Sequence, residues 1–466
     1  MGACAVVGLL LGFSIPASAQ LRVGAAKVDV TPDASLLPSP FLSVHDPLYT
    51  RAILIENGKT KALLMNLDVG KISQSLYSKL SVEISNRYGI PVNNIVMSAI
   101  HDHASVPELG GGGPATGATG TGPQSSPANQ AFIDKVYKGM LQAVEQANAS
   151  LQPAEMGFGE GKLYLNVNRD AIDPKTRQWA QEPNLDFPSD KTLAVLEFRK
   201  PNGGEPIAIY MNYAMHAVTM FLRREISSDF PGAASKYIED NYDGKVVALW
   251  TTGPAGDQNP LYLRAINALG DQQIKAETDP DTPADAGGAM IRLFAGGAKR
   301  PPVPLDPKLA AQSWQVVQAI GTIMAEETLR VMNEIPHFTT TAAIQGDSKT
   351  VSCPGRKRTG PGTFEDGPPV PIFVGALRIG DVAIGRTDSE IYNKIGQEAK
   401  AGSPFRNTMM INLADGSGGY IPSDDAFARS TFQVAGNRLK PGCAEMGIVN
   451  GVDGILHQFM EQETTK

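Results

Sequence analysis

The sequence has few of the features that mark the simplest functional classes. Its net charge is only −7, from 41 basic and 48 acidic residues. It contains no extended Lys/Arg-rich stretch and no nucleic-acid motif, which argues against binding to a phosphate backbone. The apolar run near the N-terminus is too short for an ordinary membrane span. Cysteine and histidine are scarce, with three and six residues, so tight clustering of either type is informative.

The composition is that of a globular protein with a sizeable core. Of the 466 residues, 42% are hydrophobic and 19% are charged. The 48 glycines and 34 prolines indicate many loops and turns. We find no internal repeat and no strong linker, so we interpret the chain as one large domain, although its length also permits two.

The N-terminal residues 1–19 are predicted to be a signal peptide. An apolar stretch ends in Ala17-Ser18-Ala19, a small-x-small cleavage pattern, and cleavage would leave Gln20 as the first mature residue. This predicts a secreted or periplasmic protein and a single hydrolytic domain over 20–466. A buried apolar strand is the alternative interpretation of the same stretch.

Export would remove Cys4 and leave Cys353 and Cys443. An oxidising compartment and an even count permit a disulfide between these two residues. Both lie in loop-like sequence beside glycine or proline. Two separate buried thiols explain the same pattern, and the sequence does not decide between them.

Hydrophobic periodicity predicts a mixed α/β domain. The first hundred residues indicate a strand over 23–32, a hairpin over 50–70, a helix over 71–89 and a buried strand over 94–100. Further strands are predicted over 192–199, 206–213, 245–250 and 376–385, and further helices from about 130 and over 307–334. Two Gly- and Pro-rich stretches, 104–128 and 278–308, are predicted to be loops.

A pair of histidines follows the buried strand in the segment MSAIHDHAS. If the strand continues, His101 and His103 share one face and Asp102 points away. Two imidazoles at the carboxyl end of a strand are typical of metal sites. Two surface polar residues are the alternative, and the scarcity of histidine favours function. The glycine-rich loop after them lacks the ending of a phosphate-binding loop, so we interpret it as a lid or rim, or else as a plain surface loop.

Three other segments carry candidate site residues. His216 follows the strand over 206–213, where a structural histidine is the commoner finding. Arg169 follows a short strand-like run and is either a solvated residue or a partner for a carboxylate or oxyanion. The turn over 251–260 ends another strand and either shapes a pocket or is an ordinary turn.

Taken together, these segments resemble the catalytic domain of the neutral/alkaline non-lysosomal ceramidases. The resemblance rests on segments that occur in family order across the mature chain: VGAAKVDVTP, VHDPLYTRAILI, MSAIHDHAS, NVNRD, YMNYAMHAVTM, SSDFPG, GPAGDQNP, LRIGDVAIGRTDSE and GSGGYIP.

The resemblance implies an α/β fold in which mixed β-sheets are flanked by helices. It also implies one zinc ion, whose ligands would be His101, His216, Glu390 and Tyr420. The catalytic residues would be His103, which faces the substrate and the metal-bound water, and Arg169, which holds the reacting carbonyl. The implied reaction is cleavage of an N-acyl amide bond by metal-activated water, as in the conversion of ceramide to sphingosine and a fatty acid. The expected partners are a small lipid-like N-acyl amide and a peripheral membrane contact, without nucleic acid.

Three departures from the family pattern qualify this hypothesis. Phe432 occupies the position of a catalytic tyrosine, twelve residues after Tyr420. Asp102 stands where threonine is usual. The sequence ends at Lys466 without the family's C-terminal immunoglobulin-like domain. The alternatives are therefore a weak or silent relative that binds lipid or glycan, and a zinc hydrolase acting on another small amide or ester.

Overall fold

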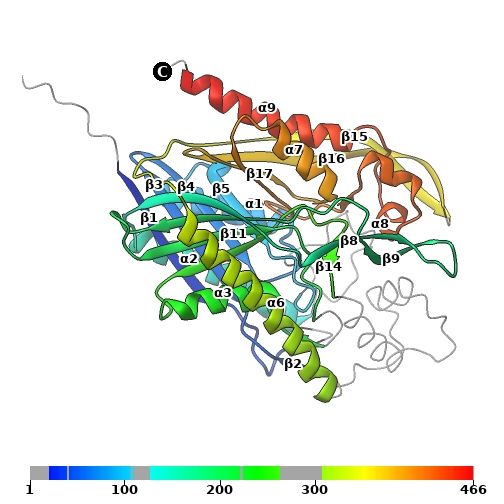
Figure 1. Cartoon of the computed structure of the whole chain (residues 1–466), viewed down its shortest axis with the longest axis horizontal. Coiled ribbons are helices and arrows are strands. Elements are labelled where there is room, and N and C mark those ends of the chain that lie inside the picture. Colours follow the sequence, from blue (N-terminus) through cyan, green and yellow to red (C-terminus); the bar gives the residue numbers. More distant parts are fainter. Residues whose placement is uncertain are drawn as a thin grey trace, which may run out of the picture.

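The computed structural model describes residues 20–38, 41–106, 109, 126–220, 224–262, 307–360 and 362–464 (Figure 1). The predicted signal peptide, most of the glycine-rich loop over 104–128 and nearly all of the stretch 278–308 lie outside these ranges. Within them, no helix combines the length and the apolarity needed to cross a membrane.

The first sheet contains the hairpin predicted from the N-terminal sequence. Its strand order is β5-β4-β3-β1-β6, and β4 and β5 run parallel while the other pairs are antiparallel. Helix α1 links the parallel pair. It begins after Ser73, whose hydroxyl caps the amide of Leu76, and it ends at Gly89, whose φ of 67° suits glycine. The elements are β1 (Leu21–Asp29), β3 (Tyr49–Asn57), β4 (Thr60–Leu67), α1 (Gln74–Tyr88), β5 (Ile95–Ala99), α2 (Pro127–Ala149) and β6 (Gln152–Pro153).

The second sheet has the order β13-β11-β10-β7, in which β11 and β13 run parallel. Three of these strands were predicted, as was the long helix α6, and all four are confirmed. Helix α3, which links the parallel pair, was not predicted. The elements are β7 (Glu155–Lys162), β10 (Thr192–Arg199), β11 (Pro206–Tyr213), α3 (Asp229–Asn241), β13 (Val247–Thr252) and α6 (Pro307–Glu334).

The third sheet has the order β15-β16-β17-β19 and includes a long hairpin that the sequence did not reveal. The prediction of one strand over 376–385 was wrong, because the chain reverses at Gly380, with φ 63°, and forms parts of two strands. Cys353 and Cys443 form a disulfide that ties β15 to the segment before α9. The elements are β15 (Ile344–Gly360), β16 (Thr363–Ile379), β17 (Val382–Thr387), α7 (Asn393–Gly402), β19 (Asn407–Ile411), α8 (Phe432–Ala435) and α9 (Ala444–Thr464).

Three small sheets are formed by strands interspersed in the sequence among those of the large sheets. Each is short, and two of them contain only a pair of residues per strand. They are β14-β8-β9, with β8 (Asn166–Ile172), β9 (Trp179–Asn184) and β14 (Gln258–Pro260); β12-β2, with β2 (Ser43–Val44) and β12 (Glu225–Ile226); and β18-β20, with β18 (Glu390–Ile391) and β20 (Tyr420–Ile421).

The sheets share a central core and carry their helices outside. Apolar side chains from all three large sheets meet in one cluster that includes Ile53, Leu196 and Ile384. Helices α1 and α2 cover the other face of the first sheet, and α3 and α6 cover the second. Figure 1 shows α9, in red, lying along the outside of the sheet that contains β15, β16 and β17. This arrangement confirms the predicted mixed sheets flanked by helices.

Each large sheet contains one parallel pair joined by a helix: β4-α1-β5, β11-α3-β13 and β17-α7-β19. In such a unit both strands have their carboxyl ends on the same side of the sheet, and binding sites in α/β proteins usually form just outside those ends. His101, His216 and Glu390 lie two or three residues beyond the ends of β5, β11 and β17. The fold therefore brings the carboxyl ends of the three parallel strand pairs together.

Candidate metal centre

His101 and His103 follow β5, and their side chains converge. The Nε2 atoms of the two rings are 3.4 Å apart. The expectation of a continuous strand was wrong, because β5 ends at Ala99 and His101 adopts a φ of 61°. A positive φ is unfavourable for a residue with a β-carbon, and such strain often marks functional sites. Asp102 still points away, and its Oδ1 accepts from the amide of Ala104.

His216 lies just beyond the end of β11, and it presents its Nε2 to the same space. Its Nδ1 is 2.9 Å from the carbonyl oxygen of Gln258. A carbonyl can only accept, so Nδ1 carries the proton and Nε2 carries a lone pair. Burial, together with the charge of Arg169 and the His101 ring, lowers the pKa of His216 to about 3. The imidazole is therefore neutral at neutral pH, as a metal ligand must be.

Glu390 follows β17 and Tyr420 follows β19, two strands of the third sheet. The two residues pair directly in the parallel β18–β20 ladder. Glu390 is buried, and its Oε2 lies 3.0 Å from Nε2 of His101 and 3.4 Å from Nε2 of His216. The hydroxyl of Tyr420 lies 3.3 Å from Nε2 of His216. The four predicted ligands thus surround one small volume although they span more than three hundred positions of sequence.

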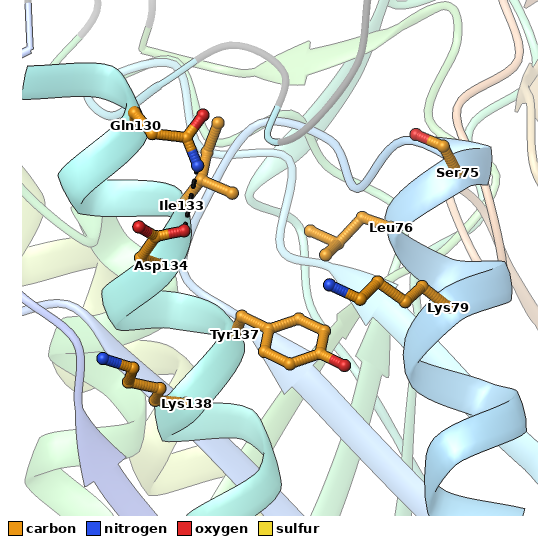
Figure 2. Close-up of a pocket in the computed structure, with 8 residues that line it drawn as sticks. All are labelled: Ser75, Leu76, Lys79, Gln130, Ile133, Asp134, Tyr137 and Lys138. Carbon is orange, nitrogen blue, oxygen red and sulfur yellow. Dashed lines mark hydrogen bonds between the residues drawn. The ribbon is translucent and has the colours of Figure 1, made fainter. Parts of the chain in front are cut away.

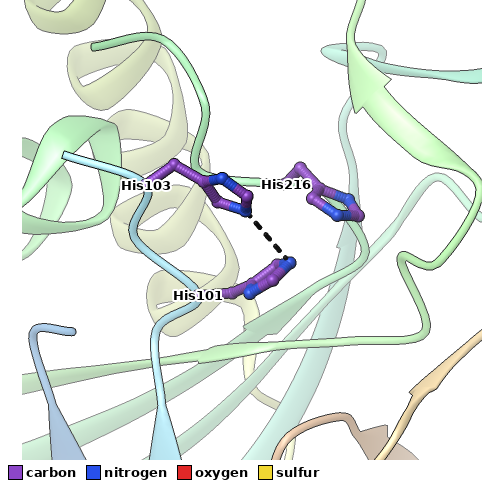
Figure 3. Close-up of side chains that lie close together, drawn as sticks. All are labelled: His101, His103 and His216. Atoms are coloured by element: carbon purple, nitrogen blue, oxygen red, sulfur yellow. Dashed lines mark hydrogen bonds between the residues drawn. The ribbon is translucent and has the colours of Figure 1, made fainter. Parts of the chain in front are cut away.

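The polar atoms that meet there are mainly acceptors. Figure 3 shows the rings of His101, His103 and His216 pointing toward one another from two segments, and their ligand atoms all lie within 4.8 Å of one another. Within the described ranges, the buried Oε2 of Glu390 has no hydrogen-bond partner. Buried acceptors that face each other without a donor repel, and a cation between them removes this penalty. Imidazole, carboxylate and phenol oxygen are a donor set that suits zinc.

The charges of the site favour an ionised Glu390. Burial acts to raise its pKa, but the ammonium of Lys71 and the nearby His101 outweigh it and hold the pKa well below its usual range. Lys71 Nζ lies 2.5 Å from Oε1 of Glu390. Burial and Glu390 raise the pKa of Tyr420 above its ordinary value. Tyr420 therefore keeps its proton at neutral pH unless a cation stabilises the phenolate.

Burial also lowers the pKa of His103 well below its usual range, helped by the rings of His101 and His216. A neutral His103 can accept a proton at Nε2, which is the ring atom that faces the cluster. The side chain is less buried than that of His101. This position fits a group that handles protons beside a metal better than it fits a purely structural histidine.

Arg169 lies in β8 beside Tyr420, and protein acceptors already fix its guanidinium. Nη1 donates to Oδ1 of Asn259 at 3.1 Å and Nη2 donates to the carbonyl of Gly256 at 2.6 Å. With its amide oxygen turned toward Arg169, Gln433 accepts from Nε at 2.8 Å and from Nη2 at 3.1 Å. These contacts occupy four of the five N–H groups of the side chain.

Phe432 completes this side of the site. Its ring packs edge to face against Tyr420, with centroids 5.3 Å apart, and lies 5.4 Å from Cζ of Arg169. The position that the resemblance assigns to a catalytic tyrosine therefore does face the site. It brings an apolar ring there instead of a hydroxyl.

The turn over 251–260 packs against the centre and orients two of its residues. Its residues provide the carbonyl that orients His216 and two acceptors for Arg169. Gly256 packs against the backbone at Glu390, where an added β-carbon would lie 2.6 Å from the Glu390 carbonyl oxygen. Only glycine allows the two loops to approach this closely. The turn thus shapes the site, which was one of its two predicted roles.

Sequence reasoning missed Lys71 and Gln433. Lys71 follows the second hairpin strand directly, and a basic residue at the carboxyl end of a buried strand was the available signal. Gln433 carried no signal, because an amide on a short helix has many ordinary uses.

The structure also contains a pocket of about 290 Å³ between α1 and α2, shown in Figure 2. It is lined by Ser75, Leu76, Lys79, Gln130, Ile133, Asp134, Tyr137 and Lys138. None of these residues belongs to the histidine centre. We therefore do not assign the chemistry to this pocket.

With this geometry established, comparison with known proteins identifies the family. Residues 42–278, slightly more than half of the chain, match the family described as "Neutral/alkaline non-lysosomal ceramidase, N-terminal". The chain belongs to this family. The match includes His101, His103, Arg169 and His216 of the predicted ceramidase site. Glu390 and Tyr420 lie beyond the matched segment, so the tertiary structure alone places them at the centre.

Individual ceramidases are distant relatives. The chain is 28% identical over 274 residues to the neutral ceramidase of Pseudomonas aeruginosa, covering 54% of this chain and 39% of that protein. It is 31% identical over 114 residues to neutral ceramidase B of Dictyostelium discoideum, covering 24% of this chain and 16% of that protein. The chain thus spans about two fifths or less of the length of these curated relatives.

The crystal structure of neutral ceramidase from Pseudomonas aeruginosa has the same fold. It matches with a TM-score of 0.66 at 16% identity, covering 94% of this chain and 75% of that chain. A structure described as ceramidase complexed with C2 matches with a TM-score of 0.67 at the same identity. The likeness covers nearly the whole chain, and at this identity it establishes the fold alone.

Proposed function

We propose that the protein is a zinc-dependent amidohydrolase that cleaves the N-acyl bond of ceramide or a related N-acyl lipid. Membership of the ceramidase family and the convergent acceptors of the candidate centre support this proposal. The observation that carries it is the meeting of Nε2 of His101, Nε2 of His216 and the unpartnered Oε2 of Glu390 in one buried volume.

His101, His216, Glu390 and Tyr420 would hold the zinc. When bound, zinc polarises the amide carbonyl and lowers the pKa of water toward about 7. The carbonyl oxygens of Gly70 and Gln258 lie 3.4 Å and 2.9 Å from the Nδ1 atoms of His101 and His216, which keeps Nε2 of each ring available. Such contacts fix the tautomer and the orientation of ligand histidines.

The other residues would move protons and fix positions. His103 is neutral, faces the cluster with Nε2, and would accept the proton of the attacking water and pass it to the leaving amine. Arg169, which makes a side-chain hydrogen bond to Tyr420, would hold this tyrosine in place and bring its positive charge near the reacting carbonyl.

Metal content and turnover, measured together, test this proposal. Wild-type protein should bind about one zinc per chain, as a mononuclear site does, and should hydrolyse N-acyl sphingosine or simple N-acyl amines. His101→Ala should lose both properties. The exposed His457, on α9, provides a control, and His457→Ala should retain both. Equal zinc in wild type and His101→Ala would remove His101 from the ligand set.

A second function is favoured by Phe432. A ceramidase-family protein that lacks a hydroxyl at this point could bind a lipid or glycan with little turnover, or could act on another small amide or ester. A panel of amides and esters separates these candidates. Zinc-loaded protein that binds N-acyl sphingosine without hydrolysing any member of the panel would be a binding protein rather than an enzyme.

We also propose that the protein is exported and meets its substrate at a membrane surface. The apolar segment of residues 1–19 and the disulfide between Cys353 and Cys443 support an oxidising compartment. Mass spectrometry of the protein purified from culture medium and periplasm gives the N-terminus directly. A mature chain that begins at Gln20 is the expected result.

A further inference from the structure

The two carboxylate oxygens of Glu390 have different surroundings. Oε2 faces His101 and His216 at 3.0 Å and 3.4 Å and has no hydrogen-bond partner among the described residues. Oε1 lies 2.5 Å from Nζ of Lys71. A free carboxylate can bind a metal through one oxygen or through both. Here one oxygen is available and the other is bound by a cationic donor.

The backbone around Lys71 fixes this contact. Residues 70–73 pair with the segment after the histidine motif: Gly70 N donates to Val106 O, Leu109 N donates to Lys71 O, and Ser73 N donates to Leu109 O. Immediately before Lys71, the carbonyl of Gly70 lies 3.4 Å from Nδ1 of His101. Two adjacent residues therefore contact two candidate ligands, one through the backbone and one through the side chain.

Lys71 also reaches the segment that carries Tyr420. Its Nζ lies 3.5 Å from the carbonyl oxygen of Gly418, two residues before that tyrosine. The side chain is only 18% exposed, so its flexibility is restricted and its charge is little screened. The ammonium thus contacts both Glu390 and the segment that leads into β20.

From these contacts we propose that Lys71 is a positioning residue that makes Glu390 a one-oxygen ligand. The inference rests on the metal site of the proposed function. The ammonium holds Oε1 through a charge-assisted hydrogen bond, which is stronger than a neutral one. Only Oε2 then reaches the metal, and a coordination position stays open for water and substrate.

Cobalt absorption tests the number of donors directly, without requiring activity. Co²⁺ replaces zinc in such sites, and its visible bands weaken as donors are added. In Lys71→Met the freed Oε1 should join Oε2, so the bands should lose intensity. Lys71→Arg restores a cationic donor and should restore the wild-type bands. Lys79→Met, the same change on α1, is the matched control and should have the wild-type spectrum.

The outcomes separate the inference from the proposal beneath it. If Lys71→Met binds Co²⁺ with wild-type bands, Lys71 merely balances buried charge and the inference is wrong, while the metal site stands. If wild-type protein takes up no Co²⁺ or Zn²⁺, the proposed function fails and the inference with it. Near-ultraviolet circular dichroism checks folding, and Lys71→Leu, which also lacks a charge and a donor, should reproduce the effect of Lys71→Met.

Discussion

Two buried polar clusters of this protein differ in how their charges are satisfied. Around Arg51, Nε lies 3.0 Å from Oε1 of Glu239 and Nη1 lies 3.2 Å from Oδ2 of Asp68. Lys27 binds the other oxygen of Glu239 at 2.6 Å. Donors and acceptors alternate in this network. In the candidate centre, by contrast, the Nε2 lone pairs of the histidines face Oε2 of Glu390.

The difference separates a self-sufficient ionic cluster from a candidate metal site. In the Arg51 network, each charged partner offsets the desolvation of the next, so the cluster is complete without a ligand. In the histidine centre, Oε2 of Glu390 faces two imidazole nitrogens and has no hydrogen-bond partner among the described residues, so a bound cation would stabilise the arrangement. Burial and charge alone do not distinguish the two clusters. The direction of the hydrogen bonds does.

The largest expected effect is a loss of turnover when the histidine centre is changed. His103→Ala should lower kcat by about 10²–10⁴, the contribution of a general acid–base group, because the substitution removes the proton carrier but leaves the four proposed ligands. Zinc content and the free energy of unfolding should stay at wild-type values. Steady-state kinetics, metal analysis and urea unfolding give the three quantities.

His457→Ala, on the exposed face of α9, serves as the control. Loss of zinc from His103→Ala would contradict the assignment and make His103 a ligand, in keeping with the closeness of its Nε2 to His101.

The Arg51 network should show the opposite pattern. Arg51→Met leaves Asp68 and Glu239 buried without their shared cation, which should reduce the free energy of unfolding by about 3–5 kcal/mol. Zinc content should not change. Urea denaturation measures the loss. In Arg22→Met, a 2.8 Å ion pair with Glu56 is removed at an exposed position, and the change should be about 0–1 kcal/mol.

Equal losses from Arg51→Met and Arg22→Met would show that the buried network does not depend on its central cation. The contrast between the two clusters would then lose its energetic basis.

Phe432→Tyr sharpens the comparison by adding a hydrogen-bond donor to the histidine centre. The new hydroxyl would lie beside Tyr420 and Arg169, where the reacting carbonyl is proposed to sit, and should raise kcat/KM by about 10²–10³. Kinetics on N-acyl sphingosine measure the gain. Phe427→Tyr adds the same hydroxyl beside Arg356, outside the centre, and should have no effect on turnover. An unchanged rate for Phe432→Tyr, with zinc intact, would place the chemistry on the other side of the cluster.

Glu197 on β10 represents a third condition, a buried acid that forms no ion pair among the described residues, so the charge of Arg199 offsets its burial only in part. Burial raises its pKa from 4.5 to about 7. The folded state therefore binds a proton that the unfolded state has lost, so stability falls as the pH rises from about 4.5 to 7. Glu197→Gln removes this dependence, and the variant should gain about 2–3 kcal/mol over wild type between pH 4 and pH 8.

Urea unfolding at the two pH values tests this, and comparison with wild type cancels the contributions of other acids. Glu182→Gln, at an exposed position, should follow the wild-type pH profile. A gain of the same size in Glu182→Gln would mean that the effect is not due to burial.

Much of the fold could be predicted because its elements carry local signals. The stripe of Leu76, Leu80 and Ile84 indicates α1, and Gly89 marks its end. Asn57-Gly58 marks the first hairpin, and Gly58 has the left-handed φ, 63°, that such turns require. The hairpin at Gly380 was missed although Gly380-Asp381 is a two-residue turn signal, because the apolar residues on both sides of it were interpreted as one strand. The long β15–β16 hairpin was missed because its exposed outer half lacks a hydrophobic pattern.

The residues of the candidate site also divide into those that the sequence predicted and those that it did not. The histidine pair stood out locally, and the family resemblance supplied the remaining residues. The prediction that the strand continues through His101 was wrong, because a positive φ after a strand leaves no mark in the sequence. Lys71 and the acceptors of Arg169 were not predicted, because their roles depend on contacts between segments far apart in the chain.

The sequence by itself determined many of the strands and helices and the residue types able to bind a metal, since these follow from periodicity, turn chemistry and side-chain type. The tertiary structure alone decided that the carboxyl ends of three parallel pairs meet, which places Glu390 and Tyr420 beside His101 and His216. It also decided which carboxylate oxygen remains available. The reason is that packing of the sheets around a shared core sets distances between residues that no local pattern encodes.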